Sequence, residues 1–127
     1  MGYTNYYNQP TDFTDVEWKK IKMEADYVRS WSLLPQVSNY CEVSISRDKI
    51  EIYGSCETFV LNKKARTQPR YEGDDVSFHF CKTREQVYDL AVWHLLSVCH
   101  IVKSDFTISR DNHNFTETIE PKAVVNG

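Results

Sequence analysis

The densest apolar pattern of the chain lies in residues 76–99, which read VSFHFCKTREQVYDLAVWHLLSVC. Its first part predicts a buried strand, because Val76, Phe78 and Phe80 alternate with polar residues. Its last part predicts a long helix with a wide apolar stripe. That stripe comprises Tyr88, Val92, Leu95 or Leu96, and Cys99, and Trp93 broadens it. The rest of the chain must pack against this strand and helix, so they constrain the fold most.

The turn between this strand and helix is polar and cationic. Thr83 and Gln86 have the spacing of a capping box, which predicts a helix that begins at Arg84. The first N–H groups of a helix are unpaired and its N-terminus is partly positive, so it attracts anions. Lys82 and Arg84 add two charges there. The turn could therefore hold a phosphate or carboxylate, and the alternative is a plain capping box with two solvated cations.

The N-terminal part predicts a strand followed by a helix. Residues 2–9 are rich in Tyr and Asn, and Pro10 ends the strand that they predict. Thr14 and Glu17 form a capping box, so a helix should begin at Asp15. Both signs of charge on its polar face favour packing on a core over lying on a membrane. Its apolar stripe comprises Trp18, Ile21, Ala25 and Val28 and can extend to Ser32.

Further strands are predicted where the apolar period changes to two. Residues 40–46 and 49–53 predict a hairpin with one apolar face, and 57–61 and 106–109 predict two more strands. Residues 62–75 predict a long loop, in which four cations precede three acids. Such a charge run is typical of a solvated loop. The alternative is a flap that closes over an anion.

Together these elements predict an α+β fold. We expect a single domain over residues 1–127, with a mostly antiparallel sheet of about five strands packed by two amphipathic helices on one face. At 127 residues and 41% hydrophobic content, the chain can bury one core without staples. The tail, residues 111–127, mixes polar residues with Pro121 and can be irregular.

Charge and cysteine usage bear on partners and location. A formal net charge of -3 excludes wholesale attraction to duplex nucleic acid, so a nucleotide contact must be local. The sequence shows no signal peptide and no apolar run of membrane-spanning length, which indicates a cytoplasmic protein without a membrane partner. No metal or cofactor is expected, because the histidines share no ligand spacing with the cysteines. The cysteines expected to be free thiols are Cys41, Cys56, Cys81 and Cys99.

The N-terminal aromatic cluster could form the second half of an anion site at the cationic turn. Its tyrosines can stack on a base or sugar, and Asn5 and Asn8 can read a polar edge. The alternative is an aromatic cluster that is only core. Asp89 lies inside an apolar stretch, where it could pair with Arg84 or a ligand hydroxyl or lie on the surface. The candidate ligand-binding residues are Tyr3, Thr4, Asn5, Tyr6, Tyr7, Lys82, Thr83, Arg84, Tyr88 and Asp89.

Several short motifs, in the same order, resemble a family of small phage and prophage proteins. Those proteins begin Gly-Tyr-Thr-His-Tyr-Trp and carry Phe-Cys-Lys-Thr with a downstream Tyr-Asp. The matching segments here are Gly2-Tyr3-Thr4-Asn5-Tyr6-Tyr7, Glu57-Thr58-Phe59, Phe80-Cys81-Lys82-Thr83-Arg84 and Tyr88-Asp89-Leu90. This chain departs from the pattern at Asn5, at Tyr7, and at Gln86-Val87, where Lys-Pro is usual. The resemblance implies that the N-terminal strand and the Lys-Thr turn belong to one polar site.

Three functions follow as hypotheses. The first is a phage-derived binding protein that holds a small anionic ligand and sequesters a nucleotide signal against host defence. The second is an enzyme acting on a phosphate ester, with His79, His94 or Asp89 as base, but no catalytic motif is present and Asn5 cannot transfer a proton as histidine would. The third is a protein-interaction or homo-oligomeric module. Its contact patch would comprise Trp31, Leu33 and Leu34.

Overall fold

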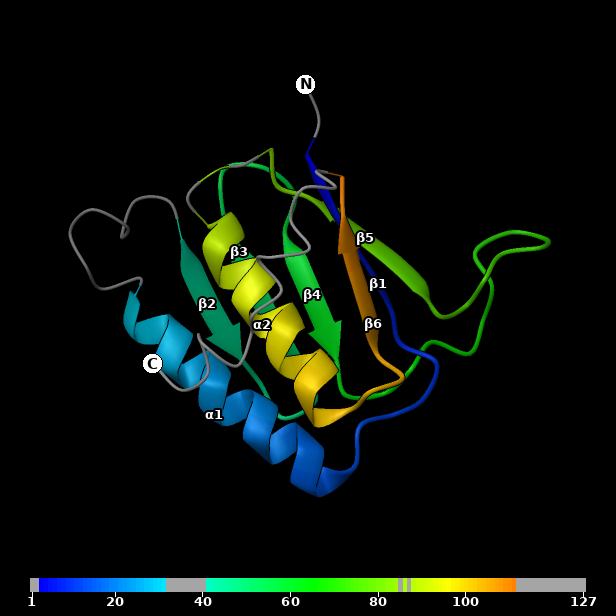
Figure 1. The fold of residues 1–127 in the computed structure, drawn as a ribbon, viewed down its shortest axis with the longest axis horizontal. Helices are drawn as coiled ribbons and strands as arrows, with labels where there is room; N and C mark the ends of the chain where they lie inside the picture. Colours follow the sequence, from blue (N-terminus) through cyan, green and yellow to red (C-terminus); the bar gives the residue numbers. More distant parts are fainter. Residues whose placement is uncertain (1–2, 32–40, 85, 87, 112–127) are drawn as a thin grey trace.

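The computed structural model describes residues 3–31, 41–84, 86 and 88–111 (Figure 1). Within them the predicted α+β class and single domain are confirmed, and no helix is long and apolar enough to cross a membrane. The elements in order are β1 (Thr4–Asn8), α1 (Asp15–Trp31), β2 (Glu42–Ile45), β3 (Lys49–Tyr53), β4 (Phe59–Asn62), β5 (Phe78–Lys82), α2 (Asp89–Val102) and β6 (Thr107–Arg110). The strands lie within two residues of their predicted positions. Leu33, Leu34 and the tail 112–127 lie outside the described residues.

The six strands form two antiparallel sheets instead of one. The first has the order β5-β1-β6, so the N-terminal strand lies between two strands from the second half of the chain. The second is the meander β2-β3-β4, which lies behind α2 in Figure 1. The sheets meet where Tyr7 O–H donates to Val60 O at 2.9 Å and Glu57 N donates to Lys82 O at 3.1 Å. Aromatic packing around Tyr7 closes the core between them.

Helix α1 forms as the sequence predicts. Glu17 N donates to Thr14 Oγ1 at 3.1 Å and Thr14 N donates to Glu17 Oε1 at 2.8 Å, so the capping box is complete. Phe13 and Trp18 stack with ring centroids 5.9 Å apart. The helix packs on α2 and β2 and buries its predicted stripe, Trp18, Ile21, Ala25 and Val28.

Helix α2 is the more buried of the two, and residues 91–99 are all buried. The prediction that it begins at Arg84 is wrong, because the helix begins at Asp89. Arg84 has φ of 55°, which is incompatible with the first turn of a helix. The Thr83 hydroxyl does not cap the helix but donates to the Asp89 carboxylate at 2.6 Å. The first residue of the helix, Asp89, has thus taken the hydroxyl that the capping box would have used.

Strand β5 faces the opposite way to the prediction. Cys81 is buried and His79 stacks on buried Tyr7 with centroids 5.1 Å apart, so these two residues face the core. Phe78 and Phe80 therefore point to the outer side of the first sheet, and Phe80 is 49% exposed. Val76 precedes the strand in a turn. The alternation of Val76, Phe78 and Phe80 predicted the wrong inner side, because both sides of this strand carry side chains that can pack in a core.

Candidate functional site

The pairing of β1 with β5 brings the N-terminal tyrosines beside the cationic turn. Thr4 is the register partner of Lys82. Beyond the strand ends, Tyr3 O accepts from Thr83 N at 3.0 Å and from Arg84 N at 3.1 Å. The two predicted halves of the site are therefore adjacent in one sheet. Their side chains, however, divide between its two sides.

On the inner side, Asp89 is the centre of a closed polar network. Its Oδ1 accepts from Asn5 Nδ2 at 2.8 Å and from Thr83 Oγ1 at 2.6 Å. Its Oδ2 pairs with Arg110, whose Nε donates to Asn5 Oδ1 at 2.9 Å. Asp89 thus pairs with Arg110 and not with Arg84. These bonds tie β1, β5, β6 and the first turn of α2 together.

Arg110 is the residue of this network that the sequence did not reveal. Its guanidinium lies between the rings of Tyr3 and Trp93, 4.7 Å and 4.5 Å from their centroids. The side chain is 10% exposed, so both ring contacts are largely shielded from water. A single cation at the end of a short strand carries no sequence signal, and only the fold places it opposite Asp89.

The backbone of the cationic turn is used within the protein. Besides the two bonds to Tyr3 O, Gln86 N donates to Thr83 O and Asp89 N donates to Gln86 O. The N–H groups of these four residues are thus not aimed at a ligand, as the helix-start prediction required. The bonds to Tyr3 O also hold Arg84 in a left-handed conformation, which costs a non-glycine residue on the order of 1 kcal/mol.

On the outer side, three rings form a surface that we call the aromatic face: Tyr6, Phe78 and Phe80. Tyr6 and Phe80 are register partners on neighbouring strands. The Tyr6 and Phe78 rings stack with centroids 6.0 Å apart, and Phe78 and Phe80 lie 6.2 Å apart. Lys82 follows on the same side of β5, since side chains alternate along a strand. Phe78 and Phe80 were missed as site residues because the sequence placed them in the core.

Carboxylates and cations both lie near the aromatic face. Tyr6 O–H donates to Asp111 Oδ1 at 2.6 Å, and this bond raises the pKa of the phenol. Asp111 Oδ2 accepts from Thr4 N at 3.0 Å, so the carboxylate is engaged on both oxygens. Lys82 and Arg84 have no ion pair among the described residues. The Glu57 carboxylate also lies at this end, where its Oε1 accepts from Lys82 N at 2.7 Å, so two cations stand beside two hydrogen-bonded carboxylates.

Two other candidate residues belong to the core. Tyr7 and Tyr88 are buried, and burial raises the pKa of both phenols. Tyr88 O–H donates to Glu57 O at 2.6 Å, and its ring packs directly on Gly54. These tyrosines position strands and cannot contact a ligand at the surface.

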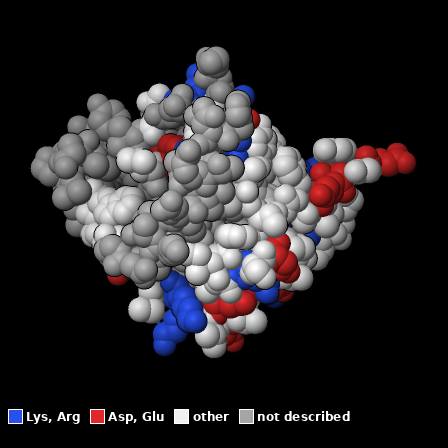
Figure 2. All heavy atoms as spheres, in the orientation of Figure 1, with Lys and Arg blue, Asp and Glu red and all other residues white. Residues whose placement is uncertain are grey.

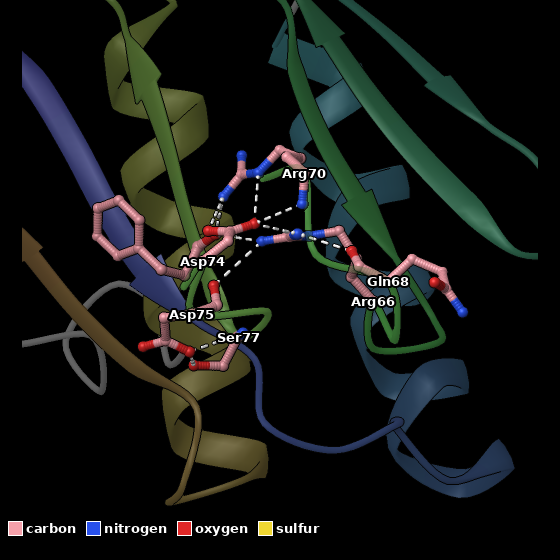
Figure 3. A network of polar contacts seen from close by, with 7 residues as sticks. Arg66, Gln68, Arg70, Asp74, Asp75 and Ser77 are labelled. Carbon is pink, nitrogen blue, oxygen red and sulfur yellow. Dashed lines mark hydrogen bonds and ion pairs between the residues drawn. The ribbon is translucent and has the colours of Figure 1, made fainter. Parts of the chain in front are cut away.

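The 62–75 loop is anchored to the edge of the first sheet by two of its cations (Figure 3). Arg66 and Arg70 pair with Asp74 at 2.7 Å and 3.1 Å, and the Asp74 side chain is only 1% exposed. These bonds hold the pKa of Asp74 far below its ordinary value. Both guanidinium groups also donate to Phe78 O, at 3.2 Å and 3.0 Å, which covers part of an edge strand.

No protein-family model, curated protein or solved structure matches this chain. The candidate residues are therefore assigned to the inner network or to the accessible side from the geometry alone. Asn5, Thr83 and Asp89 form the inner network with Arg110, and Thr4 is buried at the sheet end. On the accessible side remain Tyr6, Lys82 and Arg84, joined by Phe78 and Phe80.

Proposed function

We propose that this protein binds a nucleotide-like ligand, an aromatic ring that carries a phosphate, on the aromatic face. The observation that carries the proposal is the Phe80 ring, 49% exposed on an open sheet surface beside Tyr6 and Phe78. Nucleobases stack on aromatic side chains displayed by sheets, and each stack contributes about 1–3 kcal/mol. Stacking tolerates any base, so the face by itself selects the ring and not its identity.

The cations at the end of the face supply the preference for a charged ligand. Lys82 lies on the same side of β5 as Phe80, and exposed Arg84 follows after the strand. A phosphate attached to a base stacked on Phe80 would meet these charges first. The net charge of -3 opposes a long polyanion, which favours a single nucleotide or a short strand over a duplex.

Binding without turnover is the form of the proposal that the geometry favours. Asp89 and Asn5 are committed to Arg110 and Thr83 inside the protein, so they do not face the ring surface. The resemblance of its short motifs to those of small phage proteins is the reason for proposing a sequestering role in a host cytoplasm. The four free cysteines among the described residues suit a reducing compartment.

A thermal-shift screen with mono-, di- and cyclic nucleotides tests this proposal. At 100-fold excess over Kd, a bound ligand stabilises a protein by about 2.7 kcal/mol, a readily measured shift. Phe80→Leu keeps apolar bulk but removes the stacking surface, and Lys82→Gln removes the charge, so both should reduce the shift. Tyr71→Leu is the matched control, because Tyr71 is 66% exposed in the 62–75 loop.

Two results would contradict the proposal. One is that no nucleotide stabilises the wild-type protein. The other is that Phe80→Leu and Tyr71→Leu respond to ligand alike. Chromatography of the recovered ligand separates binding from catalysis, since a sequestering protein returns its nucleotide unchanged.

A further inference from the structure

A concave surface lies beside α1, and no residue of the aromatic face lines it. We call it the basic pocket. Its volume is about 630 Å³, and Trp18, buried in α1, forms part of its wall. Figure 2 shows Lys and Arg atoms gathered at the lower edge of the molecule, over α1. The cations that line the pocket are Lys19, Lys22, Arg47, Lys63 and Lys64.

These cations exceed the acids around them. Two acids also line the pocket, and one of them, Asp15, is paired with Lys63. The other four cations have no ion pair among the described residues. The pocket thus carries an excess of three positive charges in a chain whose net charge is -3. Like charges gathered in a concavity raise the local concentration of anions.

The backbone beneath the cations is fixed by bonds between three separate segments. Trp18 Nε1 donates to Arg47 O at 2.7 Å, which ties α1 to the β2–β3 turn. Lys63 N donates to Asp48 O at 2.9 Å, and Phe13 N donates to Lys63 O at 2.9 Å. The end of β4 is thereby joined to both the turn and the approach to α1. When the backbone that carries the binding side chains is already rigid, less conformational entropy is lost on ligand binding.

We infer that the basic pocket binds a phosphate-rich anion, either a free polyphosphate or the phosphates of a nucleic-acid strand. Four unpaired cations from α1, the β2–β3 turn and the segment after β4 converge on it, which suits several phosphate groups better than one carboxylate. No residue of the aromatic face lines this pocket. The two proposed sites share no residue, so each can be tested without the other.

Isothermal titration calorimetry with sodium tripolyphosphate tests the inference, because this probe has no ring for the aromatic face. The double variant Lys19→Gln, Lys22→Gln should weaken its binding by about tenfold or more. The control is Lys20→Gln, Lys49→Gln, which removes the same charge from exposed positions of α1 and β3 that do not line the pocket. It should bind tripolyphosphate like the wild type. Unchanged melting curves in both variants would show that the fold is intact.

The inference is overturned if the wild-type protein does not bind tripolyphosphate, or if both double variants lose binding equally. A short single-stranded oligonucleotide supplies the second arm. Competition between oligonucleotide and tripolyphosphate identifies a nucleic-acid strand as the source of the phosphates. Binding of tripolyphosphate without such competition identifies a free polyphosphate.

Discussion

Removal of the Asp89 charge should be among the most damaging single changes in this protein. The carboxylate accepts from Asn5 and Thr83 and pairs with Arg110. In Asp89→Asn, the new amide can accept at one atom only, and its N–H groups would face the guanidinium. The Arg110 guanidinium would then lose its ion pair with Asp89 at a place where its side chain is 10% exposed.

The magnitude follows from that burial. Loss of one partner of a buried ion pair costs about 3–5 kcal/mol, because the remaining charge stays desolvated. Domains of this size have a free energy of unfolding of about 5–15 kcal/mol. At roughly 4 °C per kcal/mol for a chain of this length, the melting temperature should fall by about 10–20 °C.

Urea denaturation followed by circular dichroism measures this loss, and a double-mutant cycle with Arg110→Met assigns it. Met keeps an apolar chain between Tyr3 and Trp93 but removes the charge. The double variant should therefore be more stable than the sum of the single losses predicts, by about 1–3 kcal/mol. A loss below about 1 kcal/mol in Asp89→Asn, or strict additivity, would refute the network as a buried ion pair.

Three further predictions concern packing, reactivity and pH. Gly54→Ala should destabilise the fold by about 3 kcal/mol in urea denaturation, since a Cβ there would lie 2.1 Å from the Tyr88 ring. Iodoacetamide at pH 8 should add one group to the native protein, at half-buried Cys56, because the other three thiols are buried and burial raises the pKa of Cys81 to about 12. Burial lowers the pKa of His79, so the unfolded chain takes up its proton first and stability should fall as pH drops below about 6.5. His79→Phe keeps the stack on the neighbouring tyrosine and should flatten that slope between pH 7 and 5.

Each of these expectations has a plain contrary result. Wild-type stability in Gly54→Ala would mean that the Tyr88 ring is free to move. A second alkylated cysteine without unfolding would contradict the burial of the other thiols. An unchanged pH slope in His79→Phe would assign the acid sensitivity to other groups.

The local signals in the sequence succeeded where the contacts that decide the structure are also local. Thr14 and Glu17 form their capping box because both partners lie within one turn of α1. The same signature at Thr83 and Gln86 failed, because the hydroxyl bonds to Asp89 and the turn bonds to Tyr3 O. The residues of the turn do not indicate either contact, and Tyr3 lies far from them in the sequence.

The candidate site shows the same difference between local contacts and contacts that depend on the fold. The N-terminal tyrosines and the cationic turn are adjacent, yet Tyr6 and Lys82 lie on the outer side of the sheet while Tyr7 lies on the inner side. Which side of β5 faces the core depends on whether His79 or Phe80 packs on Tyr7. These residues lie far apart in the sequence, so no local pattern decides between them. Arg110 reaches the network only through the pairing of β6 with β1, which the sequence did not predict.

The aromatic face is tested most directly by titrating a nucleotide into ¹⁵N-labelled protein and following the backbone amide signals. The proposal predicts that the shifts concentrate on the outer side of the first sheet, at Tyr6, Phe80 and Lys82, and that Phe80→Leu abolishes them. Shifts confined to the basic pocket, or no shifts at all, would contradict it.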